Sequence, residues 1–254
     1  MELGLLSTKV IEILAASFRV APIFLSSSMT PFSRLPSVAK ITLGLFIGMF
    51  AVFNTDLSLQ TSQLNTSSVL FILLNEFLLG WIFVFGFIAI QSAIMTLGRM
   101  VEMQIGFGAA GIINPQSNQT ESVIGTALTM VSVLLLFAVS ADHIFIQAIW
   151  SSFAVAPLGF SLQANAHEYL VPTLAAQFYL ALLLVLPISL ALLALDMVIG
   201  FLSKTMPQMN IYFVSLPLKI SLGIMVFAFC APLMLNHFKL MFQELISYWR
   251  IVLG

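Results

Sequence analysis

Charged side chains are scarce in this sequence. Lysine, arginine, aspartate and glutamate make up 7% of the 254 residues, whereas soluble globular proteins carry about 25%. Hydrophobic residues make up 60%, and the mean hydropathy is +1.09. The net charge is -1 and no two basic residues are adjacent, so the sequence offers no basic cluster for nucleic acid or acidic lipid. The composition therefore predicts an integral membrane protein, in contact with membrane lipid and without a nucleic-acid partner.

Cysteine and histidine are nearly absent as well. The single cysteine, Cys230, excludes an intramolecular disulfide and a multi-cysteine metal site. The three histidines form no HExxH pair, and no GxSxG motif occurs, so the sequence lacks the motifs of zinc-dependent and serine hydrolysis. We therefore expect no cofactor, no metal site and no enzymatic activity.

Long apolar runs dominate what is present. A membrane-spanning helix needs about 20 apolar residues, and about six runs of suitable composition occur, at residues 10–28, 38–53, 69–97, 123–150, 171–202 and 212–235. The sequence therefore predicts an all-α fold of membrane-associated helical hairpins. The last two runs are interrupted by prolines, which free carbonyl groups that neighbouring helices must satisfy. Basic residues divide almost evenly between the two sets of loops, so the positive-inside rule does not fix the topology.

The first predicted helix carries charges of both signs on one face. With each residue advancing 100°, an arc of about 100° contains Glu2, Lys9, Glu12 and Arg19. A mixed-charge stripe prefers a protein partner over lipid tails, so we predict these residues at a subunit interface. A helix lying near the headgroups, with snorkelling charged ends, is the alternative.

Ionisable residues also lie inside the apolar runs, where each must face a partner, a cavity or water. On one continuous helix, an arc of about 80° contains Glu76, Gly80, Gln91, Gly98 and Glu102. We expect this face to contact protein or an aqueous lumen, and we place Glu76 at a subunit interface. The alternatives are polar groups that are satisfied locally, or a small permease or ion channel with a charge relay of Glu76, Asp196 and Lys219.

A glycine-rich polar stretch interrupts the apolar sequence between Gly106 and Glu121. Its GFGAAG matches the dinucleotide fingerprint, but that site needs a preceding strand and a following amphipathic helix, and the flanking sequence predicts neither. The glycines permit positive φ, and the residue before the proline is disfavoured in a helix. The apolar side chains of this stretch, Phe107, Ile112 and Ile113, could close a conduit by excluding water. The sequence supports equally well the alternative that the stretch is a buried connection between two helices. The candidate gating residues are Gly106, Phe107, Gly108, Gly111, Ile112, Ile113, Asn114 and Pro115.

A second polar segment separates the last two apolar runs, where a hairpin must turn. Its backbone groups need hydrogen-bond partners. We predict that this connection docks on a neighbouring subunit through Pro207, Gln208, Asn210 and Pro217.

Four segments together resemble the FliR family, the membrane component of the flagellar type III protein export gate, which has a homologue in virulence injectisomes. They are the loop motif QIGFGAAGIINPQSNQ, DHIFI at 142–146, APLG at 156–159 and KTMPQMNIYFVSLPLKISLGIM at 204–225. The resemblance covers essentially the whole chain. Gly98-Arg99, Asn114-Pro115 and Asp142-His143 stand where the family commonly has Gly-Glu, Asp-Pro and Gly-His. These departures shift charge near the loop and leave its glycines in place.

The resemblance implies a single export-gate unit over residues 1–254, with a FliP-like part at about 1–170 and a FliQ-like hairpin at about 171–254. Such a unit completes a hetero-oligomeric helical ring with FliP and FliQ, and FlhB is a further expected partner. Unfolded flagellar subunits would pass through the channel, which the loop at 106–121 would plug when closed. The implied location is the bacterial inner membrane at the flagellar basal body.

Overall fold

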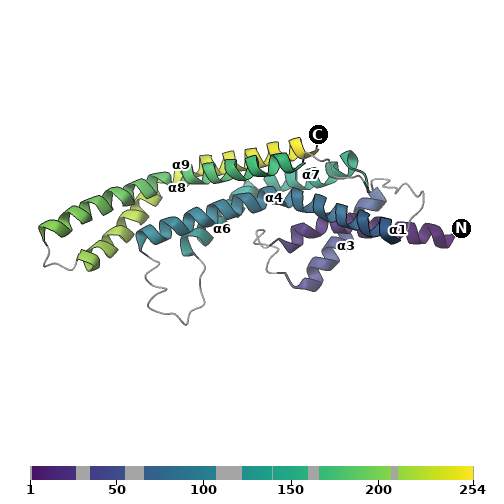
Figure 1. The fold of residues 1–254 in the computed structure, drawn as a ribbon, viewed down its shortest axis with the longest axis horizontal. Coiled ribbons are helices and arrows are strands. Elements are labelled where there is room, and N and C mark those ends of the chain that lie inside the picture. The colour runs from purple at the N-terminus through teal and green to yellow at the C-terminus, as the bar shows by residue number, and fades with distance from the viewer. Residues whose placement is uncertain are drawn as a thin grey trace. The chain divides into compact units, whose positions relative to one another are not determined.

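The computed structural model describes residues 2–26, 35–54, 66–106, 122–138, 140–159, 166–206 and 211–253. Every regular element in these ranges is a helix (Figure 1), which confirms the all-α prediction. The helices are α1 Glu2–Leu25, α3 Ser37–Asn54, α4 Thr66–Ile105, α6 Val123–Ala138, α7 Ala141–Val155, α8 Ala166–Thr205 and α9 Ile211–Leu253.

Three of these helices are far longer than a membrane crossing requires. α4 and α8 have 40 residues each and α9 has 43, which corresponds to about 60 Å or more at 1.5 Å per residue. A bilayer's hydrocarbon core is about 30 Å thick. Four helices, α3, α4, α8 and α9, are long and apolar enough to span it, or five spans if α6 and α7 count as one broken span.

Two of the apolar runs account for the difference from the expected count of about six. The first run forms α1, which carries Lys9, Glu12 and Arg19 and is not among the candidate spans. The run at 123–150 is divided into α6 and α7 around Ser140, whose φ of 56° is left-handed, a conformation uncommon outside glycine. The count of about six was thus an approximation.

Contacts between Cα atoms divide the chain into two compact units. The first comprises Met1–Ala89, Ser140–Ala175 and Gln243–Gly254, and the second comprises Ile90–Val139 and Ala176–Phe242. The boundaries fall within α4, α8 and α9, so each unit is assembled from segments that are distant in the sequence. The division at about residue 170 that the resemblance implies remains a prediction.

Small residues bring the helices of the first unit close together. α1 packs on α3, where a Cβ atom on Gly48 would lie 2.7 Å from the backbone nitrogen of Ser17. α4 approaches α1 at Gly80, where a Cβ atom would lie 2.9 Å from Pro22 Cγ. A side chain at either position would therefore push the helices apart, and close backbone approach of this kind is typical of helices that pack in membranes.

Aromatic side chains form part of the first unit's core. The Trp249 ring lies with its centroid 5.4 Å from that of Phe87 and 5.3 Å from that of Phe145. Its Nε1 donates a hydrogen bond to the Phe83 carbonyl at 3.0 Å, and the Tyr248 hydroxyl donates to the Ile82 carbonyl at 2.7 Å. Both polar tips are thereby satisfied while the rings are buried, which anchors the end of α9 on α4.

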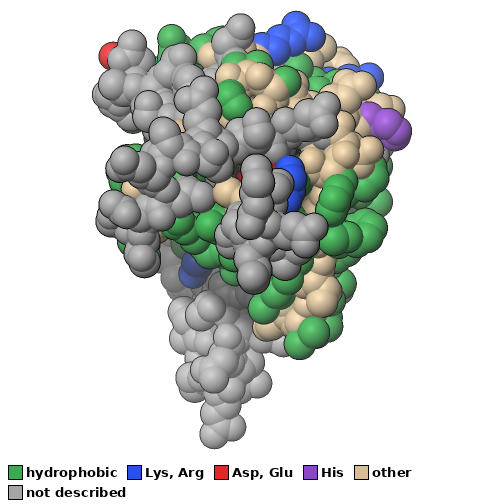
Figure 2. All heavy atoms as spheres, turned by 90° about the vertical axis from the view of Figure 1, so that its right-hand side faces the viewer, with side chains coloured by type: hydrophobic (Ala, Val, Ile, Leu, Met, Phe, Trp, Pro, Cys, Tyr) green, Lys and Arg blue, Asp and Glu red, His purple; other side chains and the backbone are tan. Residues whose placement is uncertain are grey.

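Much apolar surface remains uncovered by the chain itself. Figure 2 shows hydrophobic side chains spread over the visible described surface, with few charged ones among them. An 18-residue apolar stretch of the α9 segment Phe213–Ile251 is only 11% buried. Exposed apolar surface on this scale marks contact with a membrane or with other proteins.

Candidate functional site

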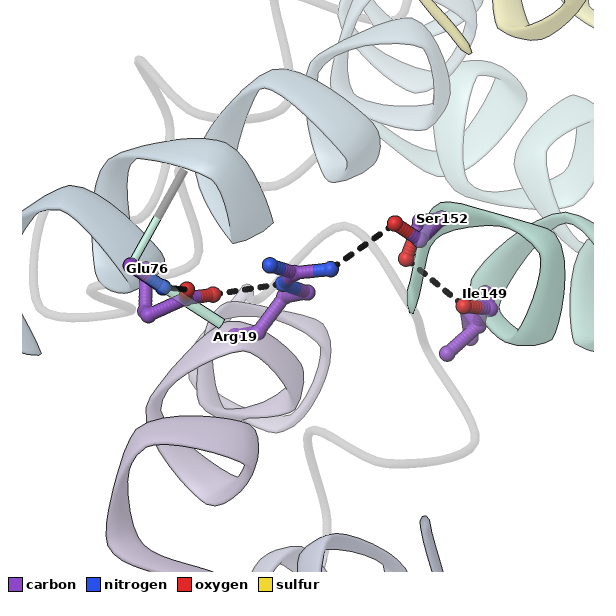
Figure 3. A network of polar contacts seen from close by, with 5 residues as sticks. Arg19, Glu76, Ile149 and Ser152 are labelled. Carbon is purple, nitrogen blue, oxygen red and sulfur yellow. Dashed lines mark hydrogen bonds and ion pairs between the residues drawn. The ribbon is translucent and has the colours of Figure 1, made fainter. Parts of the chain in front are cut away.

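A buried ion pair connects three helices of the first unit. Arg19 of α1 places its Nε 2.6 Å from Oε2 of Glu76 on α4, and the two side chains are 4% and 0% exposed. Arg19 Nη1 donates to the Ser152 carbonyl in the last turn of α7 at 2.9 Å. Figure 3 shows the Arg19 side chain lying between Glu76 and Ser152.

Both charged groups of this pair also bind backbone atoms where α7 ends. The other oxygen of Glu76, Oε1, accepts a hydrogen bond from the Gly159 amide at 3.0 Å. Gly159 has a φ of +84°, which only glycine adopts readily. The Arg19 guanidinium carbon lies 4.5 Å from the centre of the Phe153 ring, a cation–π contact. Arg19 and Glu76 therefore hold the last turn of α7 and the turn that follows it.

The other charges of α1 behave differently. Lys9 is half exposed and its Nζ lies 2.8 Å from Oε2 of buried Glu12, while the Glu2 side chain lies outside the described residues. Of the predicted mixed-charge stripe, Arg19 is paired with a residue of another helix and Lys9 with Glu12 of the same helix. The assignment of these residues and Glu76 to a subunit interface stays a prediction.

In the second unit, polar contacts fix both ends of the segment that contains the predicted gating loop. α4 ends at Ile105, and the amide of Gly106, with a φ of +97°, donates to the Glu102 carbonyl at 3.1 Å. The Glu102 carboxylate accepts hydrogen bonds from the Ser122 hydroxyl and from the Ile124 amide. Ser122 in turn accepts from the Gly125 amide at 2.9 Å, as a helix N-cap residue does.

The sequence of α4 and α6 explains this arrangement. Gly98 lies against Gly125, where an added Cβ atom would come within 2.6 Å of the Gly125 Cα atom. The glycines let the two helices approach, and a carboxylate at the N-terminus of α6 is favoured by the helix dipole. Gly98, Glu102, Gly106, Ser122 and Gly125 together form the α4–α6 junction, which holds Gly106 and Ser122 through hydrogen bonds.

The polar face predicted on α4 lies against other helices of the same chain, and its place at a subunit interface or an aqueous lumen stays a prediction. Glu76 and Gly80 meet α1, while Gly98 and Glu102 meet α6. Gln91 donates through Nε2 to the Ser132 hydroxyl of α6 at 3.2 Å. In each case the partner belongs to the same chain.

Most residues predicted in the two connecting loops lie outside the described residues. These are Phe107, Gly108, Gly111, Ile112, Ile113, Asn114 and Pro115 of the gating loop and Pro207, Gln208 and Asn210 of the hairpin connection. Pro217 was placed in that connection, but it lies exposed inside α9. The helix begins at Ile211 and continues through this proline, which removes one N–H donor without ending the helix.

The sequence analysis did not identify the groups that bind Arg19, Glu76 and Glu102. The Ser152 carbonyl and the Gly159 amide are backbone atoms and carry no sequence signal. Ser122 could have been found, since a serine directly before an apolar helix is a common N-cap. In the described part of the chain, no three histidine, cysteine, aspartate or glutamate residues come together as metal ligands would.

Comparison with known proteins places these features in context. The family model for bacterial export proteins, family 1, matches residues 10–245. The flagellar biosynthetic protein FliR of Bacillus subtilis is 23% identical over 244 residues, 93% of this chain and 92% of its own length. FliR of Aquifex aeolicus is 25% identical over 241 residues, 92% of each chain. The surface presentation of antigens protein SpaR of Shigella sonnei is 24% identical over 223 residues, 84% of this chain and 82% of its own length.

Proposed function

Because the chain belongs to the family of bacterial export proteins, family 1, we propose that it is a structural subunit of the flagellar type III protein export gate. The observation that carries this proposal is the family match over residues 10–245. Relatives named flagellar biosynthetic protein FliR, similar along more than nine tenths of their length, support the flagellar assignment. The location that follows is the bacterial inner membrane at the flagellar basal body.

The gate subunit acts as part of a hetero-oligomer. Homologues of FliP and FliQ would complete a helical ring with it, FlhB would bind as a further partner, and unfolded flagellar subunits would pass through the channel. The sparse burial of the α9 segment Phe213–Ile251, 11% in an apolar stretch, supports a need for neighbours. The role is structural and needs no cofactor or catalytic group of its own.

The segment between Gly106 and Ser122 would plug the closed pore. The α4–α6 junction supports this proposal, because a gating segment needs anchored ends, and here Gly106 and Ser122 both donate hydrogen bonds to Glu102. Phe107, Ile112 and Ile113 are the proposed obstructing side chains, since apolar groups close a narrow conduit by excluding water.

The rival function, a permease with an intramembrane charge relay, has less support. A relay residue must offer a free proton site, but both carboxylate oxygens of Glu76 accept hydrogen bonds, one from Arg19 and one from Gly159.

Co-expression tests the assembly. We expect the chain to yield little stable protein alone and to purify as a defined complex with homologues of FliP and FliQ. The physical reason is the large apolar surface that lipid or neighbouring helices must cover. A monodisperse, detergent-stable protein obtained without any partner would contradict the gate function and favour the permease.

Solute permeability tests the plug. Cells carrying the assembled complex should leak ions and small solutes when Gly108 to Ile113 is deleted, and to a lesser degree with Phe107→Ala. Phe46→Ala is the matched control, because Phe46 is an exposed side chain of α3 far from the loop in sequence. Unchanged permeability of a deletion complex that is shown to assemble would make the segment a structural helix connection.

A further inference from the structure

Two contacts fix the pairing of α8 and α9 in the second unit. The buried Gln177 donates through Nε2 to the Met241 carbonyl at 3.1 Å, and Lys219 Nζ lies 2.5 Å from Asp196 Oδ1. Residues later in α8 thus meet residues earlier in α9, as in an antiparallel pair, and Figure 1 shows the two helices running side by side.

The outer surface of this pair is apolar. On α8, exposed side chains recur every three or four residues, which places them on one face of the helix; they are Leu182, Leu186, Leu190, Leu193, Met197 and Phe201. On α9, exposed apolar side chains include Leu218, Ile224, Met225, Phe229 and Leu233. The α8 stripe is about 30 Å long at 1.5 Å per residue, the thickness of a hydrocarbon layer.

One ion pair lies within this apolar surface. The Asp196 side chain is 44% exposed and the Lys219 side chain is 21% exposed. Leu193 and Met197, about one turn and one residue away, are both exposed and apolar. A carboxylate can accept about four hydrogen bonds, and among the described residues Lys219 is the one partner that the structure gives to Asp196. The Asp196 carboxylate is therefore the more exposed member of the pair and has room to accept further hydrogen bonds.

We propose that the surface around Asp196 docks an apolar helix of a partner subunit that presents a basic or amide side chain to the Asp196 carboxylate. Acyl chains offer no hydrogen-bond donor, and a partly uncovered charge in hydrocarbon is costly. The sign of the partner's group follows from the exposed fractions, because the negative member of the pair is the more open one. This inference rests on the proposed function, which supplies the partner subunits.

Gly200 offers a position for a probe. It lies one helical turn after Asp196 on α8, and an added Cβ atom would meet nothing within 4 Å. A photoreactive phenylalanine analogue in place of Gly200 should therefore leave the helix pair intact. In membranes that contain the complex with the FliP and FliQ homologues, we expect it to cross-link to one of those partners. Adducts with lipid alone, or with a second copy of this chain alone, would overturn the proposal.

A substitution provides the second readout. Asp196→Leu should reduce the amount of complex recovered with the partners about tenfold, as expected when one charge-assisted hydrogen bond is lost, and Asp196→Asn should reduce it less. Glu168→Leu is the matched control, because it removes an exposed carboxylate at the start of α8. Recovery of the Asp196→Leu complex at the parent level would mean that an apolar group covers the site.

The outcomes separate the two proposals. If the parent chain forms the complex but the probe at position 200 reaches no partner subunit, the docking surface is wrong and the gate function stands. If the parent chain fails to form any complex with the FliP and FliQ homologues, both proposals are wrong. The cross-link is made on the chain with Asp196 intact, so it does not depend on how the substituted chains fold.

Discussion

Reversing the charges of the Arg19–Glu76 pair should not restore stability. In an ordinary ion pair, exchanging the two residues preserves the attraction. Here each partner has a second task that depends on its chemistry, because Arg19 donates to the Ser152 carbonyl and Glu76 accepts from the Gly159 amide. A carboxylate at position 19 would face another acceptor, and a guanidinium at position 76 would face another donor.

The single substitution Glu76→Gln gives the size of the expected loss in the free energy of unfolding. Removing one partner of a buried ion pair costs about 3 to 5 kcal/mol, and this pair is almost completely buried. For a chain of this size such a loss lowers the melting temperature by roughly 6 to 20 °C. We expect a shift of this order for Glu76→Gln, measured as the thermal stability of the purified complex.

Two double variants test whether the second hydrogen bonds of Arg19 and Glu76 matter. Arg19→Glu with Glu76→Arg should be no more stable than Glu76→Gln. Arg19→Met with Glu76→Leu should be more stable than Glu76→Gln, because the Ser152 carbonyl keeps its bond from the Ala156 amide at 2.9 Å and only the Gly159 amide loses its partner, at about 1 to 3 kcal/mol. A charge-reversed variant as stable as the parent would show that the hydrogen bonds of Arg19 to Ser152 and of Glu76 to Gly159 do not contribute to stability.

Three further predictions concern helix packing. Gly48→Ala should lower the melting temperature of the complex, because the new methyl group meets the α1 backbone, whereas Gly200→Ala, in open space, should be neutral or slightly stabilising. Ser122→Ala should cost about 1 kcal/mol through loss of the α6 N-cap, and Ser122→Thr should retain most of it in the same melting assay. Trp249→Phe should cost about 0.5 to 1.5 kcal/mol, because it removes the hydrogen bond that Nε1 donates to the Phe83 carbonyl while that carbonyl stays within the hydrogen-bonding pattern of α4, and equal denaturation midpoints would contradict a stabilising role of that bond.

The sequence predicted the class of fold and the resemblance to the FliR family, and both are confirmed. Long apolar runs produce long helices whatever their neighbours are, and the polar face of α4 follows from helix periodicity alone. The pairing of Arg19 with Glu76 could not be predicted in the same way. The two residues are 57 positions apart and lie on different helices, so no local pattern links them. The division near Ser140 was missed because its left-handed conformation has no glycine to announce it.

The interleaved make-up of the first unit has a consequence for biosynthesis. Its core requires Trp249 and Tyr248, which reach back to carbonyl groups 166 residues earlier in the chain. A ribosome must therefore have synthesised the chain through Trp249 before this unit can close, and until then Phe83 and Phe87 of α4 lack their contacts with the Trp249 ring. Contacts of such large sequence separation form late and expose the nascent chain to misassembly. Loss of the residues from Gln243 onward would thus leave the unit that contains residues 1–89 without part of its core.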